Sequence, residues 1–431
     1  MRSRLLWRRS GAAAGLYLSV AFGLAGTIVA ANELGIRSFG VFAFALATAS
    51  FFQMLLDLTV EDSLTKYGFR YVERREFGRL RRLFQVAVRI KLGGGVLAAA
   101  VIAALAPLAE WIVEDGVWVP ILVASLLPLV QSVENVAGTA LLLHGRYDLR
   151  GWYSALAQGL RFVGVVVGVQ LGPWQAVAGI VTAQACATLL VAGAGLEALR
   201  RFPAAAPAPI GEDRAEIRSF VIASTVGTGV VSLRTTLPPL VLGPVAGTSA
   251  VGLYKIAQAP QTGLGAASSP VRLVLLTEQT RSWEQGRESV VFAGLRRYML
   301  VAAGLMAVAV PVFYVLMPWL VRTVFRDETY EGAITAARVV LFAGALQVVL
   351  GWTKSFPTTI GRPRLRILTH GLEAAVLLPL VGLLGHRHGV TGAAVAVLVS
   401  TVVFGLAWLV VLVRIRSERR AVREARSAVA G

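Results

Sequence analysis

The stretch VSLRTTLPPLVLGPVAGTSAVGLYKIAQAPQTG, from Val231 to Gly263, decides how this chain folds. Most of it is apolar enough to lie in lipid, and a Leu-Gly-Pro turn divides it into two segments. Each segment nevertheless carries a cation, Arg234 in the first and Lys255 in the second. A charge near the centre of a bilayer costs at least about 2.5 to 3.5 kcal/mol. The two cations therefore need a structural or functional explanation.

The composition places the chain in the membrane. Of its 431 residues, 56% are hydrophobic and only 15% are charged, which is too apolar for a soluble protein of this length. The net charge of +18 comes from basic residues between the apolar segments, a pattern typical of membrane orientation signals rather than of a nucleic-acid surface. Cys186 is the single cysteine, which excludes an intrachain disulfide and a cysteine metal site.

The apolar pattern predicts an all-α integral membrane protein. A bilayer core of about 30 Å requires about 20 apolar helical residues per crossing, and about twelve segments of the sequence meet that requirement. They cover residues 11–31, 38–58, 86–108, 118–143, 152–171, 175–198, 219–242, 249–276, 297–321, 331–353, 366–386 and 390–413. The first is longer than the apolar core of a signal peptide, so we expect it to be a retained helix.

The basic residues orient these segments. Of the 42 Lys and Arg residues, 34 fall at the amino terminus, in alternate loops and in the carboxyl tail. Because cytoplasmic loops carry the Lys/Arg excess, both termini are predicted to be cytoplasmic. We also expect the basic stretch Lys66 to Arg82 and the tail RIRSERRAVREAR to lie on anionic membrane lipids.

The domain organisation follows from an Ala/Pro-rich passage, RRFPAAAPAPIGEDRAEIRSF, which is typical of a linker. We predict a six-helix bundle over 1–198, a cytoplasmic linker over 199–218, a second six-helix bundle over 219–413 and a basic cytoplasmic tail over 414–431. ELGIRSFGVFAFALA in the first half and VLGPVAGTSAVGLYKIAQA in the second share a Leu-Gly turn followed by an aromatic-bearing helix. These stretches indicate parallel repeats, with chance coincidence of two short motifs as the alternative.

Three stretches carry a resemblance to a known family: LGIRSFGVFAFAL, LDLTVEDSLTKYGFRYVERRE and SAVGLYKIAQAPQTG. The chain resembles the polysaccharide exporters and O-antigen-type, lipid-linked oligosaccharide flippases of the multidrug, oligosaccharidyl-lipid and polysaccharide exporter superfamily. The resemblance implies two bundles around a central cavity, lined largely by the first, second, seventh and eighth helices. It also implies that polyprenyl-diphosphate-linked oligosaccharide crosses the bacterial inner membrane by alternating access. That activity would serve surface polysaccharide synthesis, such as lipopolysaccharide or exopolysaccharide.

No enzyme signature accompanies this resemblance. The sequence has neither a P-loop nor a His-Glu-x-x-His zinc motif, so we expect a non-enzymatic transporter without cofactor or metal. A polysaccharide polymerase or glycosyltransferase is a further expected partner. Two alternatives stay open: a cation-coupled small-molecule antiporter of the same superfamily, and a membrane-embedded glycolipid polymerase or ligase.

Three cations are candidates for binding the anionic headgroup. Arg234 and Lys255 fall in the outer half of the bilayer, and neither of their segments contains a nearby carboxylate. Arg338 is a weaker third candidate because the acidic stretch RDETYEG lies beside it. Snorkelling of the long side chains is the structural alternative. We expect Arg234→Ala to lower translocation without lowering protein abundance.

The remaining intramembrane charges admit structural roles. Glu134 and Arg161 occupy equal depths on consecutive segments, which favours an ion pair over ion coupling. Glu373 is a candidate for ion coupling, with a structural tether such as Lys354 as the alternative.

Prolines mark a candidate hinge in the seventh and eighth segments: Pro238, Pro239, Pro260 and Pro270. Because proline removes a backbone donor and kinks helices, both segments are expected to be bent or broken. Ordinary tolerated membrane proline is the alternative.

Overall fold

The computed structural model of this chain describes residues 2–285, 287–354, 356–362 and 364–430. Side chains are described for residues 11, 13–268, 279, 282–283, 285, 287–354, 356–357, 359–362 and 364–418. Across these residues every regular element is a helix. In chain order they are α1 (Arg2–Leu56), α2 (Val60–Glu73), α3 (Phe77–Ile112), α4 (Trp118–Ala124), α5 (Leu126–Gln131), α6 (Glu134–Leu143), α7 (Tyr147–Val169), α8 (Pro173–Arg200), α9 (Asp213–Ala257), α10 (Ala259–Glu284), α11 (Glu288–Val324), η1 (Glu328–Gly332), α12 (Ala333–Val349), η2 (Gly351–Lys354), α13 (Phe356–Thr359) and α14 (Arg364–Ala430).

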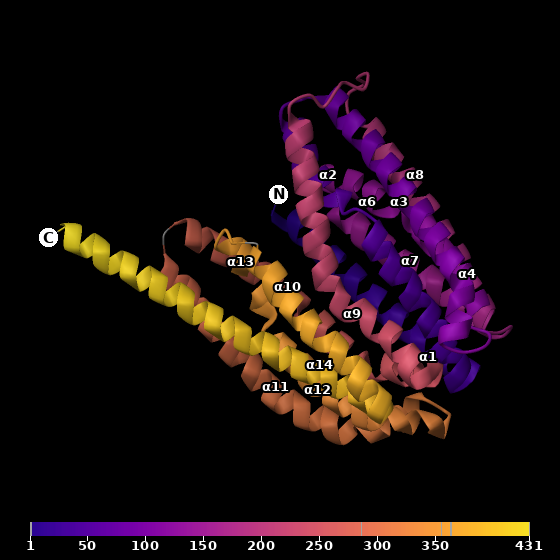
Figure 1. The fold of residues 1–431 in the computed structure, drawn as a ribbon. Helices are drawn as coiled ribbons and strands as arrows, with labels where there is room; N and C mark the ends of the chain where they lie inside the picture. Colours follow the sequence, from indigo (N-terminus) through magenta and orange to yellow (C-terminus); the bar gives the residue numbers. More distant parts are fainter. Residues whose placement is uncertain (1, 286, 355, 363, 431) are drawn as a thin grey trace.

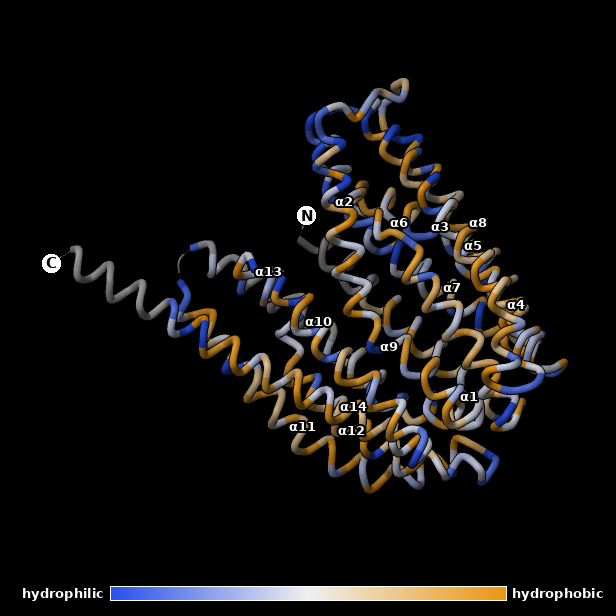
Figure 2. Tube along the Cα trace, in the orientation of Figure 1, coloured by the Kyte–Doolittle hydropathy of each residue, from blue (hydrophilic) through white to orange (hydrophobic). Residues whose placement is uncertain are grey.

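Nine helical stretches within the described residues are long and apolar enough to cross a membrane. Their outer faces carry large apolar side chains; on α11, for example, Leu305, Val308 and Val315 are 63%, 69% and 72% exposed. Figure 2 shows this apolar character along the length of α11. Lipid tails are as apolar as leucine, so such a face is stable in a bilayer. The prediction of an all-helical, multi-pass membrane protein is therefore confirmed.

Three of the longest helices are interrupted at a glycine. The backbone leaves helical geometry at Gly35 in α1, Gly247 in α9 and Gly389 in α14, where φ is +71°, +82° and +56°. Glycine adopts these positive values without the steric cost that other residues incur. Each of the three elements therefore consists of two helical pieces, and the interruptions fall in the turns predicted after the first, seventh and eleventh segments.

The helices form two groups that meet at one end and diverge at the other (Figure 1). Helices α1 to α8 make up one group and α10 to α14 the other, while α9 packs along both α1 and α14. Both chain termini and the 201–212 connection lie toward the diverging end. The long connection between α8 and α9 is therefore on the same side of the molecule as the termini.

Close packing joins the two groups where they meet. Gly40 of α1 lies against the carbonyl of Thr248 in α9, so closely that a Cβ at Gly40 would overlap that oxygen. Polar contacts add to this junction. Asn32 Nδ2 donates to the Val324 carbonyl at 2.9 Å, and the Arg326 amide donates to Asn32 Oδ1 at 2.9 Å. These contacts hold the meeting end closed.

A second set of contacts attaches the start of α9 to the first group. Tyr71 of α2 donates to Asp213 at 2.9 Å, and Arg70 forms an ion pair with Glu216 at 3.2 Å. Burial raises the pKa of the Tyr67 hydroxyl to about 12, so this side chain stays neutral beneath the pair. The helix that connects the two groups is thus anchored on the first group at its amino-terminal end.

Of the two proline pairs, Pro238 and Pro239 lie inside a continuous helix, whereas the helix is interrupted just before Pro260. α9 remains helical through Pro238 and Pro239, while the helix is interrupted at Gln258, directly before α10 begins with Ala259 and Pro260. Pro260 has no amide hydrogen to continue the α9 ladder, which explains the interruption. The side chain of Pro270 lies outside the described residues.

Candidate functional site

A cavity of about 440 Å³ lies between the first group of helices and α9. Its walls come from α1, α5, α7 and α8 on one side and from both pieces of α9 on the other. Aromatic and aliphatic side chains such as Phe42 and Leu46 line it together with neutral polar groups such as Gln131 and Thr236. Two cations, Arg161 and Lys255, also line it. A mixed apolar and polar cavity at a helix interface is typical of a ligand site.

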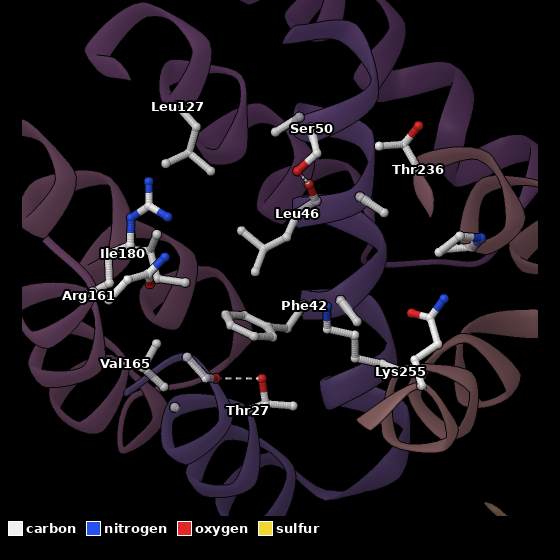
Figure 3. Close-up of a pocket in the computed structure, with 18 of the residues that line it drawn as sticks. Thr27, Phe42, Leu46, Ser50, Leu127, Arg161, Val165, Ile180, Thr236 and Lys255 are labelled. Carbon is white, nitrogen blue, oxygen red and sulfur yellow. Dashed lines mark hydrogen bonds between the residues drawn. The ribbon is translucent and has the colours of Figure 1, made fainter. Parts of the chain in front are cut away.

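The two cations face this space from opposite walls. Figure 3 shows Arg161 of α7 on one side and Lys255 of α9 on the other, with Phe42 and Leu46 of α1 between them. Each half of the chain therefore contributes one cation. An anion in the cavity would interact with both.

Lys255 has no ion-pair or hydrogen-bond partner among the residues whose side chains are described. Its side chain is exposed to the cavity rather than enclosed by protein. It also belongs to the last turn of α9, where the negative end of the helix dipole stabilises a cation by a few tenths to about 1 kcal/mol. That interaction is too small to replace a counter-ion.

Arg161 is held through a neutral amide. Its Nε donates to Gln184 Oε1 at 2.5 Å, and Gln184 Nε2 donates to Glu134 Oε2 at 2.6 Å. The predicted direct ion pair between Glu134 and Arg161 is therefore wrong: Gln184 of α8 separates the two charges. Because the amide contributes no charge of its own, the guanidinium keeps much of its attraction for an anion.

The structure corrects the expectation for Arg234. Its Nη1 donates to Glu373 Oε1 at 2.9 Å, and the Glu373 side chain is fully buried. Its Nη2 donates to Gln347 at 3.3 Å, while His370 lies 3.0 Å from the other Glu373 oxygen. Arg234 is thus neutralised within the second group and is not an uncompensated cavity cation. The partner lies on α14, 139 residues away, whereas the sequence between Arg234 and Lys255 contains no acidic residue.

Glu373 belongs to the same hydrogen-bond network as Arg234. One oxygen binds Arg234 and the other binds His370. The structure places this carboxylate in a buried polar cluster that joins α9, α12 and α14, away from the cavity lining.

Arg338 lies away from the cavity as well. Its Nε donates to the Tyr314 carbonyl at 3.0 Å, and its guanidinium lies 4.3 Å from the centre of the Tyr314 ring. The acidic stretch beside it serves another cation, because Glu331 binds Arg322 at 2.9 Å. Arg338 therefore joins α12 to α11 and does not belong to the cavity lining.

No group of three His, Cys, Asp or Glu residues that could hold a metal ion occurs in the described part of the chain. The cavity lining provides two cations, several amides and hydroxyls, and aromatic rings. Cations and hydrogen-bonding groups of this kind can bind an anionic, hydroxyl-rich molecule.

Residues 13–272 of the chain match the family described as "Polysaccharide biosynthesis protein". The chain belongs to this family. The resemblance seen in the sequence is therefore confirmed. No curated protein matches the chain.

Solved structures share the fold of this polysaccharide biosynthesis protein. An inward-facing multidrug resistance MATE family transporter of the MOP superfamily is 14% identical, with a TM-score of 0.73, and the match covers 93% of this chain and 96% of that one. The lipid II flippase MurJ in an inward closed conformation is 10% identical, with a TM-score of 0.72, covering 93% and 87%. A MOP superfamily transporter from Pyrococcus furiosus, described as having a binding pocket of reverse polarity, is 12% identical, with a TM-score of 0.65, covering 96% and 95%. At these identities the likeness establishes the fold.

Proposed function

We propose that this protein moves a polyprenyl-diphosphate-linked oligosaccharide across the bacterial inner membrane for surface polysaccharide synthesis. Membership of the polysaccharide biosynthesis family supports the pathway, and the fold shared with a lipid II flippase supports the reaction class. The proposal covers movement of the lipid-linked sugar without any new covalent bond. A polysaccharide polymerase or a glycosyltransferase would act on the same glycolipid before or after it.

The observation that carries this proposal is the Lys255 ammonium, which faces the central cavity without a protein counter-ion among the described residues. Arg161 across the cavity donates a hydrogen bond to the neutral Gln184. Phosphate oxygens accept charge-assisted hydrogen bonds from ammonium and guanidinium groups. A diphosphate headgroup would therefore supply counter-charge to both cations.

We also propose a topology of twelve crossings with both termini in the cytoplasm. The interruptions at Gly35, Gly247 and Gly389 divide three long elements into two pieces each, which supports this count. The bundles would cover 1–198 and 219–413, with the linker at 199–218 and the tail at 414–431. The termini and the 201–212 connection lie on one side of the molecule, consistent with this orientation.

Alternating access fits the asymmetry of the contacts between the two groups. At the meeting end, Asn32 and Tyr330 make hydrogen bonds across the junction, to Val324 and Ala31 respectively. At the other end the groups diverge (Figure 1). In the proposed orientation, this arrangement is closed to the outside and receives substrate from the cytoplasmic side. Outward release would require the Asn32 and Tyr330 contacts to break.

Reconstitution tests the proposal. Purified protein in liposomes would receive a fluorescent polyprenyl-diphosphate oligosaccharide in one leaflet, and sidedness would be followed with a membrane-impermeant quencher. We expect the headgroup to change leaflet with no new covalent product. A longer sugar product would establish a polymerase or ligase instead, and movement of a cationic drug against a cation gradient without glycolipid movement would establish an antiporter.

A further inference from the structure

A second concave site lies on the first group of helices, away from the central cavity. It is a groove of about 640 Å³ between α3, α6 and α8, and it shares no lining residue with the central cavity. Pro207 of the 201–212 connection borders it at the end toward the chain termini. Leu196, which lines the groove, is 57% exposed, so the groove opens to the outside of the bundle.

Three arginines line this groove: Arg81, Arg89 and Arg200. None of them forms an ion pair or a side-chain hydrogen bond with a described residue, and no Asp or Glu belongs to the described lining. The Arg81 Nε atom is buried without a partner. A buried donor without an acceptor costs about 1 to 3 kcal/mol, and more when it is charged. The chemistry of this lining therefore suits an anion.

Apart from Gln85, the rest of the lining is apolar. Arg81 lies in the second turn of α3, and Arg200 ends α8, so both occupy the same end of the bundle. Phe84 and Val88 follow Arg81 along α3, and Val136 faces them from α6. Arg89 lies eight residues beyond Arg81, which is about 12 Å along the helix. Two cations at the mouth and a mainly apolar length below them, with Arg89 on the deeper wall, match the shape of a phosphorylated lipid.

We propose that this groove binds an anionic glycerophospholipid of the cytoplasmic leaflet. Its phosphate contacts Arg81 and Arg200, and an acyl chain lies along Phe84, Val88 and Val136. Basic pockets between membrane helices on the cytoplasmic side recognise such headgroups. Because the groove is separate from the central cavity, the occupant is a resident lipid rather than transported cargo. The bound lipid would fasten α8 to α3 at the end where the two groups of helices diverge.

The test is lipid binding by the purified, delipidated protein in uncharged detergent, measured by native mass spectrometry. Phosphatidylglycerol and phosphatidylcholine with identical chains are the probes. We expect one phosphatidylglycerol to bind far more tightly than phosphatidylcholine. Each basic residue near an anionic lipid contributes roughly fivefold, so Arg81→Gln/Arg200→Gln should weaken phosphatidylglycerol binding about twentyfold to thirtyfold.

A matched control is Arg74→Gln/Arg364→Gln, which removes two exposed arginines that line neither the groove nor the central cavity. It should leave binding unchanged. Equal loss in both double variants would show diffuse attraction and overturn the site. Ala192→Trp keeps all three arginines but fills the apolar slot, so it should also weaken binding. Intact thermal melting would exclude misfolding of each variant.

Competition distinguishes the sources of phosphate. Glycerol 3-phosphate, which has a headgroup but no acyl chains, should not displace phosphatidylglycerol; displacement at similar concentration would make the groove a free-anion site. A polyprenyl diphosphate that displaces phosphatidylglycerol with higher affinity would make the groove a loading site for cargo and overturn the assignment to a resident lipid. These measurements require no transport, so they stand whether or not the proposed function holds.

Discussion

Arg161 and Lys255 lie on opposite walls of one cavity, and each comes from a different half of the chain. Arg161 is tethered through Gln184, whereas Lys255 is unpaired within the described side chains. A headgroup bound between them would connect the two halves electrostatically. A rearrangement of the two halves would change the distance between Arg161 and Lys255, and with it the binding of the headgroup. Binding would in this way be linked to alternating access.

Lys255→Gln should lower glycolipid transport while leaving protein abundance unchanged. Hydrogen bonds to charged groups contribute about 1.5 to 3 kcal/mol, so we expect at least about a tenfold loss in apparent affinity for the lipid diphosphate. The measurement is the initial rate of headgroup translocation in liposomes as substrate concentration varies. Lys255→Arg is the matched control and should keep most of the activity. Unchanged transport by Lys255→Gln would remove Lys255 from the binding site.

Arg234→Ala should lower the amount of folded protein, in contrast to the expectation from the sequence. Removing Arg234 leaves the fully buried Glu373 without its ion partner. Breaking a buried pair typically costs about 3 to 5 kcal/mol. The thermal stability of the purified variant, measured in detergent, tests this.

The double variant Arg234→Gln/Glu373→Gln separates structure from transport. It removes both charges together, so it should be more stable than Arg234→Ala. If Arg234 acted on substrate instead, Arg234→Ala would be as stable as the parent protein, and both variants would be inactive in transport.

The sequence predicts the membrane fold and the positions of the glycine turns better than it predicts charge partners. Apolar length and basic loops are local properties, so helices and their turns could be recognised segment by segment; Gly35 and Gly247 fall in predicted turns. A charge partner is a property of packing. Arg234 meets Glu373 across 139 residues, and Arg161 meets a neutral amide that no charge pattern marks. Lys255 was predicted as a cavity cation because its segment contains no nearby carboxylate, and it lines the cavity.

Gln184 gives a third test. It is fully buried and hydrogen-bonds to Arg161, Glu134 and Thr188. Gln184→Leu keeps the approximate volume but removes these partners, so each charged neighbour loses a hydrogen bond at a cost of about 1 to 3 kcal/mol. We expect a lower melting temperature in detergent. A melting temperature equal to that of the parent protein would show that Glu134 and Arg161 can pair directly without the amide.

Asn32 provides a test of the closed end. It donates to the Val324 carbonyl and accepts from the Arg326 amide, both at 2.9 Å, so one side chain makes two bonds across the junction. Asn32→Ala removes both and should shift the equilibrium toward opening at that end. Because a typical hydrogen bond contributes about 0.5 to 1.5 kcal/mol, we expect the open population to rise about fivefold to a hundredfold.

Cysteine accessibility measures that shift. Cys186 would first be replaced by serine, and Thr27, which lines the central cavity, would be changed to cysteine. A membrane-impermeant thiol reagent added outside spheroplasts should label Thr27→Cys slowly in the parent background and faster with Asn32→Ala. Asn135→Ala, which changes an exposed asparagine on α6, is the control and should leave the rate unchanged. If Asn32→Ala leaves external labelling at the parent rate, the two hydrogen bonds of Asn32 do not control access, and the closure must depend on the packing of Gly40 against Thr248.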